Sequence, residues 1–216
     1  QTPAIATFLK NNKPDIKIAV LISDGASLPL ALSDVLRDLR DADLIDSTIS
    51  FGHAFGGDVE AINIYTALLS AKHRTNADVA IVSMGPGIVG TNTKFGFTGI
   101  EVAQHLDVAK TLGGKTYGVL RASSADPRER HRGISHHSLT TYSIATYQPH
   151  QLGLVSDHDL SDSMRNQLGD HGIIEKHEVV EVPSVGIVEQ MEEKGLHITS
   201  MGRTAKEDEL FFEMAA

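Results

Sequence analysis

Continuous apolar runs that alternate with segments of helical periodicity constrain the fold of this chain most strongly. The segment IKIAVLIS at residues 16–23 has the composition of a strand buried on both faces. Further strands are expected at STISFG (47–52) and ADVAIVSM (77–84), and amphipathic stretches follow them. Strands and helices that alternate in this way form parallel sheets. We therefore expect an α/β fold with a Rossmann-like open, mostly parallel sheet and helices on both faces.

Capping residues assign the helix boundaries. Ser27 and Asp58 would cap the first two helices, and Gly113 would end a third that begins near Gly99. The other expected elements are a strand at 115–123, a helix carrying Leu139, Tyr142 and Ala145 on one face, a helix near 161–168, a strand at 176–183, a helix at 184–194, a strand near 196–200 and a final helix with the capping box Thr204 to Glu207.

The domain organisation follows from the regularity of this pattern. The pattern loosens after Tyr147, and a boundary near 148–158 would leave residues 157–216 as a minor subdomain. We nevertheless expect a single domain over residues 1–216, built on one continuous sheet.

Composition and charge exclude several classes of function. The chain has no cysteine, which rules out disulfides, thiolate metal sites and a cysteine nucleophile. No apolar run approaches the ~18 residues of a membrane helix. Residues 1–156 carry 14 acids and 14 Lys and Arg, whereas residues 157–216 carry 14 acids and 5 Lys and Arg. Because a duplex-binding protein needs a broad basic face, we expect no nucleic-acid partner. The lack of a long apolar run argues against a membrane partner, and the lack of cysteine suits a cytoplasmic location.

The chemically unusual residues fall in four loops that each follow an expected strand. Ligands bind outside the carboxyl ends of the strands in an open parallel sheet. The loops at the opposite edge are plain, so this contrast is the main argument for a site. The four loops are SDGAS (23–27), FGHAFGGD (51–58), GPGIVGTNTKFGFTG (85–99) and RASSADPRERHRGISHH (121–137).

Four residues are catalytic candidates, namely Asp24, His53, His136 and His137. Asp24 is either a carboxylate at a strand end or part of a simple turn. His53 is either an acid–base group, the common role of a histidine at a strand end, or a residue that bonds a neighbouring loop. Adjacent histidines on a helix point about 100° apart, so at most one of His136 and His137 should face the site.

The glycine-rich loop indicates anion binding. GPGIVG matches G-x-G-x-x-G, but the strand before it is the third, and Lys110 stands where the dinucleotide fingerprint needs an acid. The sequence therefore argues against NAD. Glycine amides, hydroxyls and one cation would suit an anion instead. The residues expected to cradle it are Gly85, Gly87, Gly90, Thr91, Asn92 and Lys94.

The arginine-rich loop would grip the same anion. Arg128, Arg130 and Arg132 carry planar forks that match carboxylate or phosphate. The alternative is a charged surface loop held by Asp126 and Glu129. A divalent metal such as Zn, Mn or Fe is left open; it would require His53 and either Asp24 or Asp58 to converge with one of His136 and His137.

Four long motifs resemble an uncharacterised bacterial family, found mainly in Gram-positive lineages and classed as a domain of unknown function. The motifs are DGASLPLALSD, GHAFGGDVEAINIYTALL, MGPGIVGTNTKFGFTGIE and ADPRERHRGISHHS. The resemblance runs from about Ile16 to the C-terminus. It implies a cytoplasmic protein with a further N-terminal segment of β character, so that the chain starting at Gln1 would be a fragment. It transfers no catalytic residues.

We expect an enzyme, either a hydrolase or a transferase, that acts on a small anionic metabolite, for example a phosphorylated one, at the carboxyl edge of the sheet. The alternative is a non-catalytic ligand-binding or sensor domain that uses the same loops. The acidic last third would contact a partner or close a homo-oligomer.

Overall fold

Two parallel sheets form the framework of the protein in the computed structural model, which describes residues 1–23, 27, 29–85, 89–91 and 93–216. The first sheet has four parallel strands in the order β3-β2-β1-β4, the order of a Rossmann-like open sheet. Its strands are β1 (Ile18–Ser23), β2 (Ser47–Phe51), β3 (Val59–Ala61) and β4 (Val79–Met84).

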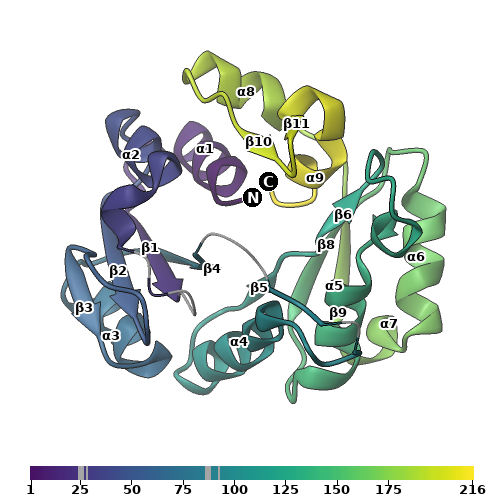
Figure 1. The fold of residues 1–216 in the computed structure, drawn as a ribbon, viewed down its shortest axis with the longest axis horizontal. Coiled ribbons are helices and arrows are strands. Elements are labelled where there is room, and N and C mark those ends of the chain that lie inside the picture. Colours follow the sequence, from purple (N-terminus) through teal and green to yellow (C-terminus); the bar gives the residue numbers. More distant parts are fainter. Residues whose placement is uncertain (24–26, 28, 86–88, 92) are drawn as a thin grey trace.

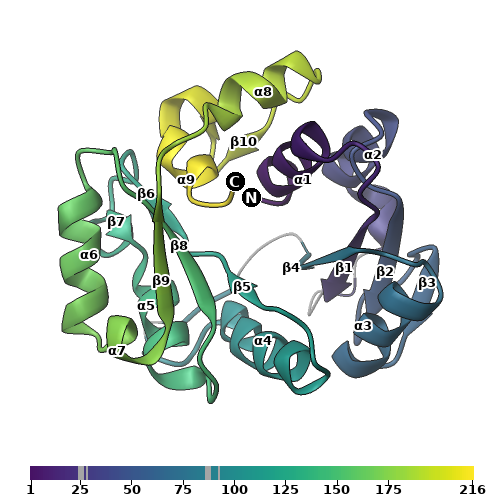
Figure 2. The ribbon, with the colours of Figure 1, turned by 180° about the vertical axis from the view of Figure 1, so that it is seen from behind.

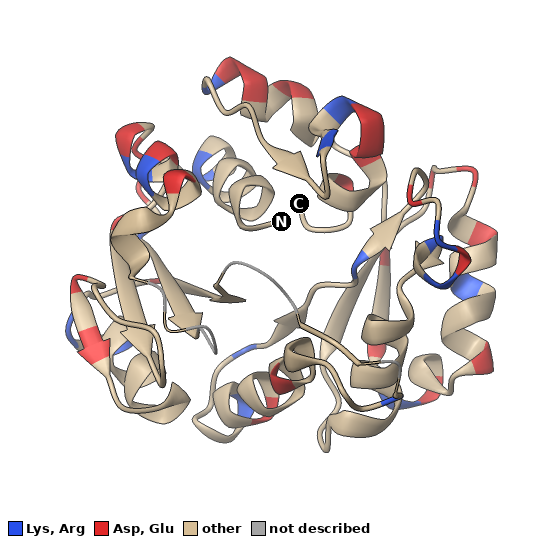
Figure 3. Cartoon of the chain, viewed as in Figure 1, with Lys and Arg blue, Asp and Glu red and all other residues tan. Residues whose placement is uncertain are grey.

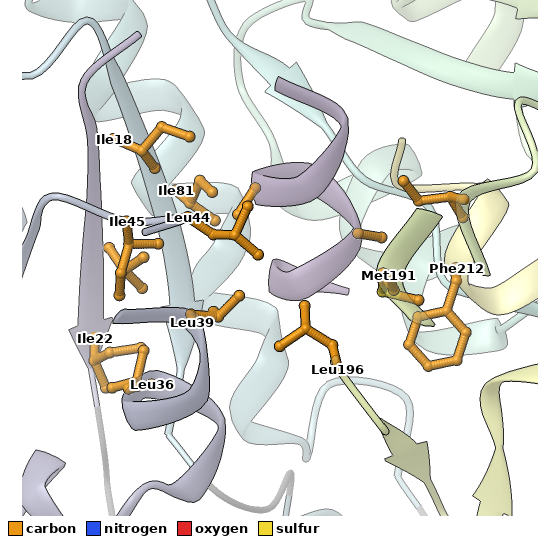
Figure 4. Close-up of a cluster of buried hydrophobic side chains, with 14 of the residues drawn as sticks. Ile18, Ile22, Leu36, Leu39, Leu44, Ile45, Ile81, Met191, Leu196 and Phe212 are labelled. Atoms are coloured by element: carbon orange, nitrogen blue, oxygen red, sulfur yellow. The ribbon is translucent and has the colours of Figure 1, made fainter. Parts of the chain in front are cut away.

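Helices cover both faces of this first sheet, as the sequence predicted (Figures 1 and 2). Alternate residues of β1 point to opposite faces, so Val20 packs with α1 and α2 while Leu21 packs with α3 and α4. Figure 4 shows the first of these cores, in which Ile18, Ile22 and Leu39 lie together. The four helices are α1 (Thr2–Asn12), α2 (Asp34–Asp41), α3 (Ile64–His73) and α4 (Glu101–Thr111).

The second sheet contains three parallel strands in the order β5-β8-β9. The prediction of one continuous sheet is therefore wrong. The chain leaves the parallel sheet at Gly118, and the irregular segment after Tyr147 contains a strand that pairs with β5 and β9. The elements of this half are β5 (Tyr117–Gly118), β8 (Gln151–Val155), β9 (Glu178–Val182), α5 (His136–Thr140), a π-helical turn η4 (Thr141–Ala145), α6 (Ser161–Asp170) and α7 (Ile173–Lys176).

The C-terminal helices join the two halves. Phe212 lies in the core of the first sheet, whereas Leu210 and Met214 lie in the core of the second. The two termini lie side by side (Figure 1), and the side chain of Gln1 donates a hydrogen bond to the carbonyl oxygen of Phe211 at 3.1 Å. The elements are α8 (Ile187–Glu193), the hairpin β10 (Thr199–Ser200) and β11 (Arg203–Thr204), the 3-10 turn η5 (Ala205–Asp208) and α9 (Glu209–Glu213).

Two predicted helix starts are wrong. Ser27 has a φ of 56° and caps no helix, because a short 3-10 turn η1 (Leu30–Leu32) intervenes and Ser33 caps α2. Asp58 is also not a cap, and Asn63 caps α3. The Asp58 carboxylate instead accepts a hydrogen bond from the Thr48 amide at 2.8 Å, which holds the chain beside β2 and lets residues 59–61 form a strand.

Other boundaries agree with the predictions. Gly113 follows α4 with a φ of 82°, the left-handed backbone conformation that ends helices. Thr204 and Glu207 form the predicted capping box. No helix in the described part of the chain is long and apolar enough to cross a membrane. Acidic residues lie on α2, α6, α8 and α9 (Figure 3).

Candidate functional site

Contacts link the four unusual loops to one another. The Leu30 amide donates to the Phe55 carbonyl oxygen at 2.9 Å, which joins the chain after the first loop to the second. The Gly85 amide donates to the Ser23 carbonyl oxygen at 2.7 Å, which joins the first loop to the third. The ring of Phe97 stacks on the ring of His137 with centroids 4.2 Å apart, which joins the third loop to the fourth. The loops therefore form one connected region.

Three histidines of the fourth loop meet in this region, and we call them the histidine cluster: His131, His136 and His137. One ring nitrogen from each lies within 4.8 Å of the other two. The centroids of the His136 and His137 rings are 4.0 Å apart, and those of His131 and His136 are 4.9 Å apart. The prediction that only one of the adjacent histidines would face the site is therefore wrong. Both stand at the start of α5, where no preceding turn restricts their side chains.

The Ser135 side chain contacts two members of the histidine cluster. It is fully buried and is the N-cap of α5, so its hydroxyl accepts a hydrogen bond from the His137 amide at 3.4 Å. The same hydroxyl lies 2.8 Å from Nδ1 of His131, which belongs to the 3-10 turn η3 (Glu129–His131). The short hairpin of β6 (Ala122–Ser123) and β7 (Gly133–Ile134) brings η3 back toward α5.

Burial and nearby arginines keep the cluster neutral at pH 7. Burial, followed by the charge of Arg121, lowers the pKa of His131 to about 4. Burial and the neighbouring His136 lower the pKa of His137 to about 4. Burial and the charge of Arg130 also lower the pKa of His136. All three rings are consequently in the form that can accept a proton or bind a metal ion.

A buried ion-pair network supports this region, and Asp126 is its centre. The side chain of Asp126 is fully buried, and its carboxylate accepts hydrogen bonds from Nε and Nη2 of Arg128 at 3.0 and 2.8 Å. Arg121 and Arg203 approach the same carboxylate at 3.7 and 3.6 Å. The hydrogen bond with Arg128 is the main cause that holds the pKa of Asp126 far below its usual range.

The C-terminal segment supplies the other half of the network, and sequence reasoning missed it. The buried carboxylate of Asp208 accepts hydrogen bonds from the Ser123 hydroxyl at 2.7 and 2.8 Å. Arg203 donates to Asp208 at 3.0 and 3.1 Å. The capping box at Thr204 indicated a helix start at this point, but no local signal indicated that the segment pairs with a loop 85 residues away.

The arginines predicted to bind an anion occupy different environments. The guanidinium of Arg128 donates hydrogen bonds to Asp126, which agrees with the alternative of a charged loop held by ion pairs within the loop. Arg130 and Arg132 are exposed, and neither forms an ion pair with any residue that the structure describes. Arg130 lies near enough to His136 for its charge to lower the pKa of that ring.

The glycine-rich loop uses many of its polar groups internally. The Thr91 amide donates to the Gly96 carbonyl oxygen at 2.6 Å, and the Thr91 and Thr93 hydroxyls lie 2.8 Å apart. Gly90 bridges Phe97 in antiparallel fashion, and Lys94 is exposed with its ammonium 6.0 Å from the centroid of the Phe95 ring. Three predicted residues lie outside the described ranges, namely Asp24, Gly87 and Asn92.

The second loop has a structural role in the part that the structure describes. A Cβ atom on Gly57 would lie 2.6 Å from the Ser50 amide nitrogen, so only glycine fits between β2 and β3. Asp58 pairs with Arg40 at 2.5 Å. His53 is exposed, and within the described ranges it forms no hydrogen bond. Convergence of His53 or Asp58 with the histidine cluster is not seen.

The fold and this region define the class: an α/β protein whose Rossmann-like sheet is joined to a second parallel sheet, with a histidine cluster above a buried arginine–aspartate network. The family can also be stated. The chain belongs to the family described as Protein of unknown function (DUF3866), whose model matches residues 1–216. No curated protein and no solved structure matches the chain.

Proposed function

We propose that the protein is an enzyme that acts on a small anionic metabolite, with a phosphorylated metabolite as the best fit. The observation that carries this proposal is the stack of Phe97 on His137, because it sets the glycine-rich loop against the arginine-rich loop. A ligand held between these two loops would touch cationic side chains and neutral histidines together.

The local charge favours an anion. The region contains Arg121, Arg128, Arg130, Arg132 and Arg203 against Asp126, Glu129 and Asp208, so five positive and three negative charges leave +2. The whole chain carries −9. A positive region on an otherwise acidic protein attracts small anions and concentrates them at one place.

Arg130 and Arg132 are the side chains that we assign to the ligand. Both are exposed, whereas the fork of Arg128 is already filled by Asp126. Lys94 would add a second cation from the glycine-rich loop. Arg128 then adds to the positive charge near the ligand without bonding it. The amides of Gly85 and Thr91 would bind the ligand only if they gave up their present hydrogen-bond acceptors.

His136 and His137 are the proposed acid and base groups. They are neutral at pH 7 and lie beside Arg130, so either ring could take a proton from a water or hydroxyl next to a bound anion. Asp24 and His53 stay candidates from the neighbouring loops. Hydrolysis or transfer of a phosphoryl or acyl group is the reaction class that such groups would serve.

One observation favours the second candidate function, a ligand-binding or sensor domain. Within the described residues, the hydroxyl that bonds a ring of the histidine cluster is that of Ser135, and this side chain is fully buried. A buried hydroxyl that caps a helix is a poor nucleophile because a substrate cannot reach it. The sensor hypothesis needs no nucleophile.

Thermal unfolding with phosphate or sulfate tests anion binding. At 100 times Kd a ligand stabilises by about 2.7 kcal/mol, or roughly 5–10 °C in Tm for a chain of this size. The double variant Arg130→Ala/Arg132→Ala should lose this rise. A control that removes two exposed cations elsewhere, Lys72→Ala/Arg74→Ala, should keep it. An equal rise in all three proteins would overturn the proposal.

Turnover separates the enzyme from the sensor. The wild-type chain is incubated with a panel of phosphate esters and carboxylic esters, with and without Mn²⁺ or Zn²⁺. Product formation that disappears in His136→Ala/His137→Ala supports the enzyme. Ligand capture without product over hours supports the sensor domain and contradicts catalysis.

A further inference from the structure

We propose that His131, His136 and His137 form a binding site for a transition metal ion, with Zn²⁺ as the ion that fits best. The site goes beyond the proposed anion function and does not depend on it, because a metal can bind the three rings when no anion is present. A ring nitrogen that holds the metal no longer accepts a proton, so the acid–base role proposed for His136 and His137 belongs to the metal-free protein.

The spacing of the three rings suits one metal ion. Tetrahedral Zn²⁺ holds imidazole nitrogens at about 2.0–2.1 Å, which places two ligand nitrogens about 3.3 Å apart. The cluster nitrogens already lie within 4.8 Å of one another, so small rotations of the rings would bring them to a common centre. Three protein nitrogens leave a fourth position open, as in catalytic zinc sites.

An unpartnered nitrogen points to a missing ligand. Nε2 of His136 is buried and has no hydrogen-bond partner among the described residues. A buried polar atom without a partner costs about 1–3 kcal/mol, so native proteins almost always satisfy such atoms. A metal ion that accepts this lone pair would remove that cost.

Neighbouring groups can orient the rings as metal ligands require. The Ser135 hydroxyl lies 2.8 Å from Nδ1 of His131, and an outer hydrogen bond of this kind fixes the ring of a ligating histidine. Phe97 holds the His137 ring in a stack with an interplanar angle of 14°.

Besides the small ring rotations, binding requires a change at the hydrogen bond between Arg121 and His131. Nη1 of Arg121 lies 2.9 Å from Nδ1 of His131, and because a guanidinium only donates, that nitrogen now accepts. Ligation through Nε2 would move the proton to Nδ1, which would then donate to Ser135. Arg121 could turn to Asp126, whose carboxylate is 3.7 Å from its Nη2.

The three imidazole nitrogens determine which metals the site would prefer. Imidazole ligands suit Zn²⁺, Cu²⁺, Ni²⁺ and Fe²⁺, whereas Mg²⁺ and Ca²⁺ prefer oxygen. The nearby arginines oppose any cation, so affinity should be lower than for three histidines in a neutral setting. Removing the exposed Arg130 should therefore tighten metal binding, an effect that misfolding would not produce.

The test measures metal binding to the full chain without a histidine tag, stripped with EDTA and held in buffer free of phosphate and sulfate. Calorimetry should show one Zn²⁺ per chain, and Co²⁺ should give a visible absorption band. His136→Ala and the fold-conserving His136→Gln should each weaken binding by roughly 100-fold or more, because loss of even an outer partner costs 10–100-fold. Arg130→Ala should tighten it about threefold.

The exposed His197 provides the matched control, and His197→Ala should bind as the wild type does. Absence of stoichiometric binding in the wild type, or unchanged binding in the His136 variants, would overturn the site. Because no anion is present, failure here leaves the anion proposal standing. An equal rise in Tm with phosphate or sulfate in all three proteins of the earlier experiment, which would overturn the anion proposal, likewise leaves this site standing.

Discussion

Two regions of the molecule place buried or half-buried histidines beside an aspartate, and they differ in how completely the rings are bonded. One is the histidine cluster above Asp126. The other is the pair His150 and His177 beside Asp107, which lies between α4 and the second sheet. Nε2 of His136 in the first region has no partner within the described chain.

Every ring nitrogen of the pair is bonded. His150 lies 2.8 Å from the Thr116 hydroxyl and 3.0 Å from the Asp107 carboxylate. His177 accepts from the His150 amide at 3.0 Å and lies 2.8 Å from the Tyr142 carbonyl oxygen. A ring with both nitrogens satisfied by protein has no capacity left for a ligand. Complete bonding therefore indicates a structural histidine, whereas the buried nitrogen of His136 without a partner is the one that we propose binds a ligand.

The aspartates should give the largest difference between the regions. Asp126→Asn removes a fully buried charge that three part-buried or exposed arginines share, and the loss of its charge-assisted hydrogen bonds should lower the free energy of unfolding by about 3–5 kcal/mol. Asp107→Asn should cost only about 1–2 kcal/mol, since an amide oxygen can still accept from the Tyr147 amide. Urea unfolding measures both, and equal losses would show that Asp126 contributes no more to stability than Asp107 does.

Truncating the histidines should give the next largest difference. His177→Ala leaves a cavity and unpaired buried partners, so we expect a loss of about 2–4 kcal/mol. His136→Ala in metal-free protein removes an atom that has no partner and should cost less than about 1 kcal/mol. If His136→Ala destabilises the protein as much as His177→Ala, the cluster is structural and the comparison fails.

The dependence of stability on pH should show a smaller effect. Burial lowers the pKa of His177 despite its bond to Tyr142, and Lys176 and His150 add to the lowering while Asp107 opposes it. Below about pH 6.5 the unfolded chain takes up a proton that the folded chain refuses, so stability falls as the pH falls toward the folded-state pKa. His177→Gln should flatten this slope by up to about 1.4 kcal/mol per pH unit.

Urea unfolding at pH 7.5, 6.5 and 5.5 measures that slope. The exposed His197 serves as the control, because His197→Gln should leave the slope as it is in the wild type. An unchanged slope in His177→Gln would show that this ring is protonated equally well in the folded and unfolded chains.

Much of the first sheet could be predicted from the sequence because its signals are local. The run at 16–23 gave β1 within two residues, and Gly113 gave the end of α4. β3 was missed because the chain after Asp58 has helical spacing, while the bonds from Asp58 to Arg40 and Thr48 hold it extended. β8 was missed because a five-residue strand with a central glycine carries a weak pattern.

The candidate site was predictable in its loops but not in its contacts. Arginines and histidines in one short segment indicated an anion or metal, and the structure brings the three histidines together. Helical geometry argued that at most one of His136 and His137 would face the site. Both residues instead stand in the first turn of α5, and a hairpin strand between η3 and α5 brings His131 beside them. The pairing of Ser123 with Asp208 depends on the tertiary fold alone.

The most direct test of the central claim is anomalous X-ray scattering at the zinc absorption edge from crystals soaked in Zn²⁺. The account predicts one dominant peak within about 2.0–2.1 Å of a ring nitrogen from each of His131, His136 and His137. A map without a peak among these rings, or with its main peak at the His150–His177 pair, would contradict it.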